Sequence, residues 1–501
     1  MHEIRIGSKY SRQQHFYGRQ SGVSRVTIQE REEAGAVASI RDHVETQPPL
    51  CGDQRQSCMN GEEHRPTRLL VQDAARLEDV ELKHDRVRNL LKATGAHAVL
   101  LQDPANIAWF TAGGDMSRCS TEECANSVFV TPDARLFATN SVDSAQIFER
   151  EAFALGFQLK QREWFQPHSE LVADLCRGRK VISDRNAGGT KSARRAIRAL
   201  RLPLTNLETD RLKTLSKVAV HAVEATGHHL KVNATESEVA AEVSHRLLKR
   251  TVAAARIQVC ADGRNERYRH WTFGDQPIKN YAVISCVARR WGLHVGVTRT
   301  ICLHSVPQNL LAAFQKATLV HATGLFFSRH GEALADVWKK IHRIYEKFEM
   351  AGEWQKADQA SVIGYSPSEV QLTPDSDHQL EAPVPMFWHP SVGPALVGDT
   401  VLCLPSANEQ LTQSSTWPRI SVKVKGREVI CPGILLIPER GTVSADHAAI
   451  ESDASAVYDL PEHPAEDSPS PVDSVWEMSV PSDDAVWQDD ESAWSRESVF
   501  D

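Results

Sequence analysis

The chain lacks a long apolar run. No hydrophobic stretch approaches the ~20 residues that a helix needs to cross a bilayer, and the mean hydropathy is -0.37. The first twenty residues, MHEIRIGSKYSRQQHFYGRQ, contain no apolar core of the kind that a secretory signal needs. We therefore expect a cytoplasmic protein without a membrane partner.

Paired cysteines are also missing. The ten cysteines form no CxxC pair, and the closest two are Cys119 and Cys124. This spacing argues against a zinc ribbon and against a thioredoxin-type motif. Scattered cysteines in a chain without a secretory signal are typical of reduced thiols, and we expect most of them in the core.

Runs of basic residues are absent, although the charge is unevenly distributed. The net charge is -8, yet residues 441–501 alone contain sixteen Asp or Glu and one basic residue, Arg496. The rest of the chain is therefore weakly positive, without a long Lys/Arg run. This pattern predicts no nucleic-acid partner.

Both ends of the chain have the composition of disordered segments. Residues 1–72 are rich in Arg, Gln, Glu and Ser and have little apolar periodicity, so they cannot bury enough surface to offset chain entropy. Residues 441–501 are acidic and rich in Ser and Pro, and we expect a disordered acidic tail. The tail holds three tryptophans among its acids, which leaves open a docking role beside that of a solvated tail.

Residues 79–204 predict a small α/β domain. The segment HDRVRNLLKATG has apolar residues at helical spacing and Gly95 as its stop. AVLLQ, SVFVTPDARLFATN and KVISDR read as strands, and SAQIFEREAFALGF as a helix that ends at Gly156. Alternating helices and strands are typical of an α/β layer.

Residues 205–440 predict a larger α+β domain. A long helix over 207–230 precedes a helix that Thr235 and Glu238 open with a capping box. Strands are expected in ARIQVCA, YAVISCVA, VGVTRTICL, DTVLCLP, ISVKV and REVICPGILLI. Two further helices are expected over 310–327 and 331–348.

The order of these segments resembles the creatinase, aminopeptidase P and Xaa-Pro dipeptidase superfamily. DRVRNLLKATGAHAVLLQDPANIAWFTAG is similar to the superfamily's N-terminal domain. DGRNERYRHWTFGDQPI, GLHVGVTRTICL, IGYSPSE, FWHPS and GDTVLCL follow in the order of its C-terminal domain. The resemblance covers roughly residues 79–437. It implies an α+β protein with a pita-bread C-terminal domain behind a smaller α/β creatinase-type domain.

The resemblance also locates the positions that hold two metal ions in the metal-dependent members. Those members use two aspartates, one histidine and two glutamates, the donor types that divalent ions need. The corresponding positions here are Ser285, Gly296, Asp358 or Ser361, His389 and Gly398. CVARRWGLHVGVTR and EWQKADQASVIGYSPSE resemble a branch that lacks the aspartates and usually carries His-His-Gln-Gly-Gly where this chain has residues 357–361. We therefore expect no bound metal and no other cofactor.

Four residues are the catalytic candidates. His270, in RYRHW, falls on the histidine that exchanges protons with substrate in metal-free creatinase, and a histidine suits acid/base work near neutral pH. His294 lies two residues before Gly296 and would share its strand face. With His389 and Asp358 it could form a cluster that transfers protons or holds one ion, or these residues could be scattered.

Three residues are the candidates for binding a substrate. Arg299 could clamp a carboxylate through its guanidinium, and the alternative is a buried ion pair. Tyr365 and Trp388 would line the same cavity or serve as core aromatics.

Three functions fit these residues. The first is a metal-independent hydrolase or lyase-type enzyme acting on a C–N bond of a small amino-acid-derived amide or amidine, with His270 as acid/base and Arg299 as anchor. The second is an inactive pseudopeptidase whose cavity binds a peptide or a partner protein. The third is a residual metallo-aminopeptidase for proline peptides. We expect a small-molecule or short-peptide substrate and, by resemblance, a homodimer formed through the N-terminal domain.

Overall fold

A computed structural model describes residues 73–116, 126–350, 352–438 and the strand at 476–479. The disorder expected for residues 1–72 and for most of 441–501 lies outside the described residues. Trp476–Ser479 form strand β20, which pairs in parallel with β17 (Arg419–Val424). At these four residues the structure has a strand where we expected a disordered chain.

The N-terminal domain is built on one mixed sheet. Helix α1 (Ala74–Thr94) begins at Asp73, whose side chain accepts a hydrogen bond from the Arg76 N–H, and ends at Gly95 in the left-handed conformation, as predicted. The strand order is β4-β3-β2-β1-β5-β6. The strands are β1 (Ala98–Leu101), β2 (Ser127–Val130), β3 (Arg135–Asn140), β4 (Gln158–Arg162), β5 (Val181–Ser183) and β6 (Lys191–Ser192). The other helices are α2 (Pro104–Phe110), α3 (Ser144–Gln146), α4 (His168–Cys176) and α5 (Arg194–Arg201).

The helix expected to end at Gly156 is shorter than predicted. After α3 the chain continues as a π-helical turn over Ile147–Glu151 and then leaves the helix. The Arg76 guanidinium binds the Glu151 carbonyl, which has no partner inside the helix beyond this point. A side chain from a distant helix therefore ends this element, and the local sequence does not show it.

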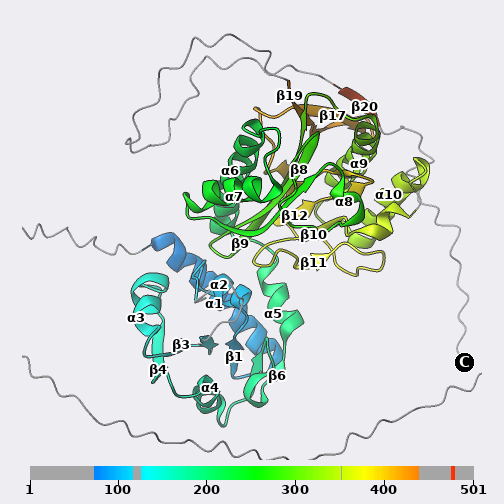
Figure 1. Cartoon of the computed structure of the whole chain (residues 1–501). Helices are drawn as coiled ribbons and strands as arrows, with labels where there is room; N and C mark the ends of the chain where they lie inside the picture. Colours follow the sequence, from blue (N-terminus) through cyan, green and yellow to red (C-terminus); the bar gives the residue numbers. More distant parts are fainter. Residues whose placement is uncertain (1–72, 117–125, 351, 439–475, 480–501) are drawn as a thin grey trace, which may run out of the picture. The chain divides into compact units, whose positions relative to one another are not determined.

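The C-terminal domain begins with two capped helices. In α6 (Asn206–His228) Thr205 and Glu208 form a capping box, and in α7 (Glu236–Leu248) Thr235 and Glu238 form the predicted one. Both helices pack against the main sheet, which has the order β19-β9-β8-β7 (Figure 1). Strands β7, β8 and β9 are antiparallel, and β19 joins β9 in parallel. Its strands are β7 (Ala253–Ala261), β8 (Tyr281–Arg290), β9 (Leu293–Leu303) and β19 (Ile434–Ile437).

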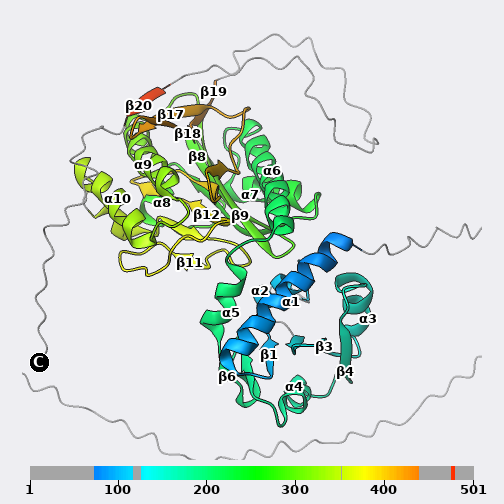
Figure 2. The same ribbon diagram turned by 180° about the vertical axis from the view of Figure 1, so that it is seen from behind.

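A second layer lies on the other side of this sheet, with α9 (Gln308–Phe327) and α10 (Leu334–Lys347) (Figure 2). It contains a five-stranded sheet in the order β11-β10-β12-β15-β16 and the hairpin of β17 and β18. The remaining elements are α8 (Arg264–Arg267), β10 (Ala360–Val362), β11 (Val370–Gln371), β12 (Val384–Trp388), β13 (Ser391–Val392), β14 (Ala395–Leu396), β15 (Asp399–Cys403), β16 (Asn408–Gln410) and β18 (Arg427–Pro432). The two layers touch where Thr298 bridges Gly398.

The expectation that no apolar stretch approaches membrane-spanning length is wrong for helix α9, which is long and apolar enough to cross a membrane by length and composition. However, 72% of its most apolar window is buried inside the protein. Buried core helices pass the same test of length and composition, so this helix is weak evidence for a membrane segment. The expectation of core cysteines is confirmed in the described part of the chain, where Cys260, Cys286, Cys302, Cys403 and Cys431 are buried.

Candidate functional site

A cavity of about 300 Å³ opens between strands β7 and β8 of the main sheet and the second layer. His270, Asp358 and His389 all line it, together with Ser285 and Ser361, two positions that the superfamily resemblance assigns to metal ligands. His270 comes from the loop after α8, Asp358 from the loop before β10, and His389 from the end of β12. Chain segments far apart in sequence thus bring three of the four predicted catalytic residues together.

Asp358 lies between the two histidine rings. Its Oδ1 is 3.8 Å from His270 Nε2, and its Oδ2 is 3.7 Å from His389 Nε2. Both separations are longer than a hydrogen bond but short enough for a strong charge interaction if either ring is protonated. The His270 side chain is 64% exposed, so a ligand in the cavity can reach it.

The two histidines have different electrostatic surroundings. Burial lowers the pKa of His389, while Asp358 acts in the opposite direction. His389 is therefore held neutral at pH 7 and can accept a proton. The Arg256 guanidinium donates a 2.7 Å hydrogen bond to His270 Nδ1. Because an acceptor nitrogen carries no hydrogen, the neutral His270 ring bears its proton on Nε2.

The residues at the positions that the superfamily resemblance assigns to metal ligands do not fit a dinuclear site. A Cβ atom added at Gly296 would lie 2.5 Å from the Phe387 ring, so this ring fills the space that an aspartate side chain would need at this position. A Cβ at Gly398 would lie 2.7 Å from Thr298 Oγ1, and that same hydroxyl donates to Ser285. Across residues 73–438, outside the gaps in that range, no group of three or more His, Cys, Asp or Glu side chains is arranged to hold an ion.

Arg299 lies outside the cavity, and its predicted role as a substrate clamp is wrong. Its side chain is 1% exposed; Nε lies 2.7 Å from Glu224 and Nη1 lies 3.0 Å from Asp399. The remaining nitrogen donates to the Thr412 carbonyl at 2.6 Å. Protein acceptors thus engage each of its nitrogens, which leaves the alternative, a buried ion pair.

His294, Tyr365 and Trp388 also lie away from the cavity. Burial lowers the pKa of His294 to about 4, and its Nδ1 contacts the Gly364 carbonyl at 3.0 Å. Tyr365 donates to Glu208 at 2.6 Å. Trp388, at the end of β12, is fully buried against α9, and its indole N–H donates a hydrogen bond to Ser328 at 2.8 Å. All three side chains are buried in the core, which for Tyr365 and Trp388 is the alternative that the sequence left open.

The cavity wall contains polar residues that sequence reasoning missed. Asn265 and Ser391 are each 2% exposed, and Asn265 Oδ1 and Ser391 Oγ have no hydrogen-bond partner. Arg269 Nε is likewise unpartnered, although Nη1 and Nη2 bind the Gly393 carbonyl and Glu353. These atoms are buried polar groups whose hydrogen-bonding capacity is unused. Asn265 and Arg269 lie in the same DGRNERYRH segment as His270, a proximity that could have singled them out.

Comparisons with known proteins agree with this architecture. Residues 210–377, about a third of the chain, match the model of metallopeptidase family M24. No curated protein sequence matches the chain.

Several solved structures have a similar fold at low identity. The Xaa-Pro dipeptidase from Bacillus anthracis is 17% identical, with a TM-score of 0.57, covering 72% of this chain and 100% of its own. Dipeptidase PepE from Mycobacterium ulcerans is 14% identical, with a TM-score of 0.59, and the match covers 72% of this chain and 99% of PepE. The Glu383Ala aminopeptidase P from Escherichia coli in complex with substrate is 13% identical, with a TM-score of 0.54. This match covers 67% of this chain and 94% of the aminopeptidase. The chain therefore has the pita-bread fold of the creatinase, aminopeptidase P and Xaa-Pro dipeptidase superfamily, with an M24-type segment at its centre.

Proposed function

We propose that this chain is a metal-independent hydrolase for a C–N bond in a small amide or amidine derived from an amino acid or a short peptide. The observation that carries the proposal is the placement of Asp358 between His270 and His389 at the cavity wall. A volume of about 300 Å³ suits a substrate of the size of a dipeptide or smaller. The structural neighbours named prolidase and dipeptidase also favour a substrate of peptide size.

His389 is the base in this proposal. Its neutral ring takes a proton from a water molecule as the water oxygen bonds to the amide or amidine carbon. The same ring then gives this proton to the leaving nitrogen as the C–N bond breaks. Asp358 stabilises the imidazolium that exists between these two steps.

His270 has a different role from the one expected. Because its Nδ1 accepts a hydrogen bond from Arg256, the neutral ring presents Nε2–H as a hydrogen-bond donor. Its exposed Nε2–H can donate to the substrate oxygen or imine nitrogen, on which negative charge develops as water attacks.

A screen of small amides, amidines and dipeptides by mass spectrometry tests the activity. We expect turnover that persists in chelator-treated protein and falls by about 10²–10⁴-fold in His389→Asn. The exposed His245 supplies a matched control, and His245→Asn should retain full activity. Turnover that disappears with chelator and returns with a divalent ion would establish the residual metallo-aminopeptidase instead.

A binding function without catalysis is the second candidate. The specific observation that favours it is that neither histidine is within hydrogen-bond distance of Asp358. If the protein is a pseudopeptidase, calorimetry should detect peptide binding while the activity screen detects no turnover. The His389→Asn variant should then keep the wild-type affinity for peptides.

A further inference from the structure

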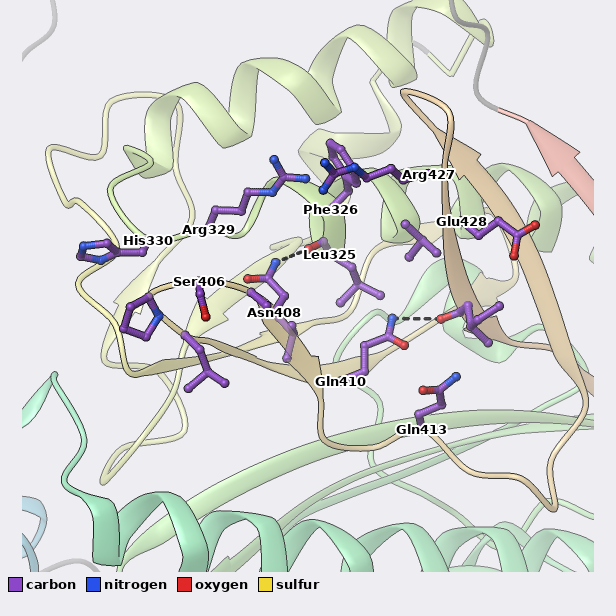
Figure 3. A pocket seen from close by; sticks show the side chains of 16 residues that line it. Leu325, Phe326, Arg329, His330, Ser406, Asn408, Gln410, Gln413, Arg427 and Glu428 are labelled. Atoms are coloured by element: carbon purple, nitrogen blue, oxygen red, sulfur yellow. Dashed lines mark hydrogen bonds between the residues drawn. The ribbon is translucent and has the colours of Figure 1, made fainter.

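A second and larger pocket, of about 550 Å³, lies away from the histidine cavity. The end of α9, strand β16 and strand β18 form its walls (Figure 3). Leu325, Val401, Leu404 and Val429 supply its apolar lining. Nothing in the proposed hydrolysis uses this pocket.

Two arginines border this pocket, and neither forms a salt bridge with a carboxylate in the described part of the chain. Glu332 acts on Arg329 through its charge, and Glu428 also lines the pocket. Figure 3 shows the guanidinium groups of Arg329 and Arg427 directed toward each other near Phe326. The Arg329 guanidinium stacks 4.0 Å from the Phe326 ring centre. Burial and then the nearby charge of Arg427 lower the pKa of Arg329. Two like charges in proximity favour an anionic ligand that would bind both.

The wall below the arginines presents amides to a ligand. Asn408 donates a 2.9 Å hydrogen bond to the Leu325 carbonyl, and Gln410 donates a 2.9 Å hydrogen bond to the Ile430 carbonyl. The dashed lines in Figure 3 mark both bonds. These bonds fix both side chains. Asn408 Oδ1 is buried and has no hydrogen-bond partner. The pocket thus combines guanidinium groups that can donate hydrogen bonds to a carboxylate, the amide side chains of Asn408 and Gln410, and an apolar floor.

Strand β20, at the start of the acidic segment, lies in the same sheet as the hairpin that borders this pocket. Strand β20 runs parallel to β17 and ends at Ser479 opposite Lys423. Because the strands are parallel, Ser479 lies at the end of β20 that is nearer the β17–β18 turn, after which Arg427 begins β18. Residues 480–491, VPSDDAVWQDDE, contain five acids, no base and one tryptophan. Asp483 is four residues from Ser479, a reach of at most about 14 Å.

We propose that the pocket bordered by Arg329 and Arg427 is a docking site for the acidic segment 480–491 of the same chain. The guanidinium groups bind its carboxylates, and the apolar floor takes an apolar side chain of the segment. The tail occupies the site in cis and so excludes acidic peptides of other proteins.

A labelled peptide of residues 480–491 tests this site by fluorescence anisotropy on full-length protein. One receptor is the wild-type chain. The other is a neutral-tail chain that carries Asp483→Asn, Asp484→Asn, Asp489→Asn, Asp490→Asn and Glu491→Gln. We expect the neutral-tail chain to bind the peptide at least about tenfold more tightly than the wild type, because its own tail no longer competes. Adding Arg329→Gln and Arg427→Gln should weaken that binding at least about tenfold.

The matched control is Arg250→Gln in the neutral-tail chain, at an exposed arginine after α7. It should leave the affinity unchanged, and added salt should weaken binding to the parent receptor. Circular dichroism and thermal unfolding of each variant establish that the fold is kept. Three results would overturn the proposal: no peptide binding to the neutral-tail chain, equal binding after both arginine substitutions, or equal affinity for wild-type and neutral-tail chains.

Discussion

At the scale of single residues, the most constrained charges lie in the core. Arg299 is held between Glu224 and Asp399, and all three side chains are at most 5% exposed. Such a triad contributes less than its Coulomb attraction suggests, because three charges have lost their hydration. Removing the central cation is nevertheless costly, since two carboxylates then remain buried without a counter-charge.

We therefore expect Arg299→Met to lower the free energy of unfolding by about 3–5 kcal/mol. Urea denaturation followed by circular dichroism measures the change. Arg195→Met is the control, because Arg195 and its partner Asp377 are both more than 80% exposed and an exposed pair contributes little. A loss of similar size in both variants would contradict the assignment of Arg299 to a structural role.

His321 makes a pH-dependent prediction. It is fully buried, both ring nitrogens lack hydrogen-bond partners, and Nε2 lies 3.8 Å from Asp399 while Arg299 faces it with positive charge. Burial, reinforced by Arg299, lowers its pKa from 6.5 to about 3. Between these pH values the unfolded chain binds a proton that the folded chain does not, so stability falls as pH falls below 6.5.

His321→Leu should reduce this loss. Between pH 7 and pH 5, the free energy of unfolding of the wild type should fall by about 2 kcal/mol more than that of the variant. The size follows because pH 5 lies about 1.5 pH units below the pKa of 6.5 that the histidine has in the unfolded chain. Urea titrations at both pH values measure the difference. His245→Leu, at an exposed site, should keep the wild-type slope. Parallel slopes for His321→Leu and wild type would show that this histidine does not titrate on unfolding.

At the scale of elements, helix α7 depends on its cap. The Thr235 hydroxyl accepts from the Glu238 N–H, and the Glu238 carboxylate accepts from the Thr235 N–H. Thr235→Ala should cost about 1 kcal/mol of unfolding free energy, measured by urea denaturation. Thr214→Ala, at an exposed site inside α6, should cost less, because alanine is the better helix former there.

Strand β9 and strand β12 meet where an aspartate would be needed for metal binding. The Phe387 ring occupies the space beside Gly296. We expect Gly296→Asp to destabilise the fold by about 3 kcal/mol or more, through overpacking and a buried charge, and to recruit no stoichiometric metal. Thermal unfolding and elemental analysis measure both effects. Gly296→Asp in a Phe387→Ala background should regain part of the stability, and a single variant as stable as wild type would refute the steric argument.

The local elements were predictable because their signals are local. Gly95 and the Thr235–Glu238 pair act within a few residues, and both appear in the structure where the sequence placed them. The partners of Arg299 could not be predicted, since Glu224 and Asp399 lie 75 and 100 residues away. The superfamily resemblance located His270, Asp358 and His389 at one cavity, but it could not show which side chains turn into the core.

At the scale of the whole molecule, the β4 edge of the N-terminal sheet is the surface that we expect to bind a partner. Strand β4 is the last strand of its sheet and is almost wholly exposed. Trp164 and Phe165 follow it, each 67% exposed, with their rings in contact at 5.9 Å. An open edge beside exposed aromatic side chains is a site for association. We propose that the expected homodimer forms at this edge.

Trp164→Asp combined with Phe165→Asp should convert the dimer to a monomer, because two charges would then be buried in the interface without partners. Sedimentation equilibrium over a range of protein concentrations measures the dissociation constant, and thermal unfolding establishes that the substitutions leave the fold intact. Leu248→Asp provides the matched control, since Leu248 is 65% exposed on α7 and far from β4 in the sequence. A double variant that still dimerises would place the interface elsewhere, and a monomeric wild type would remove the homodimer itself. Retained hydrolysis in a monomeric variant would further show that each cavity works with residues of its own chain alone.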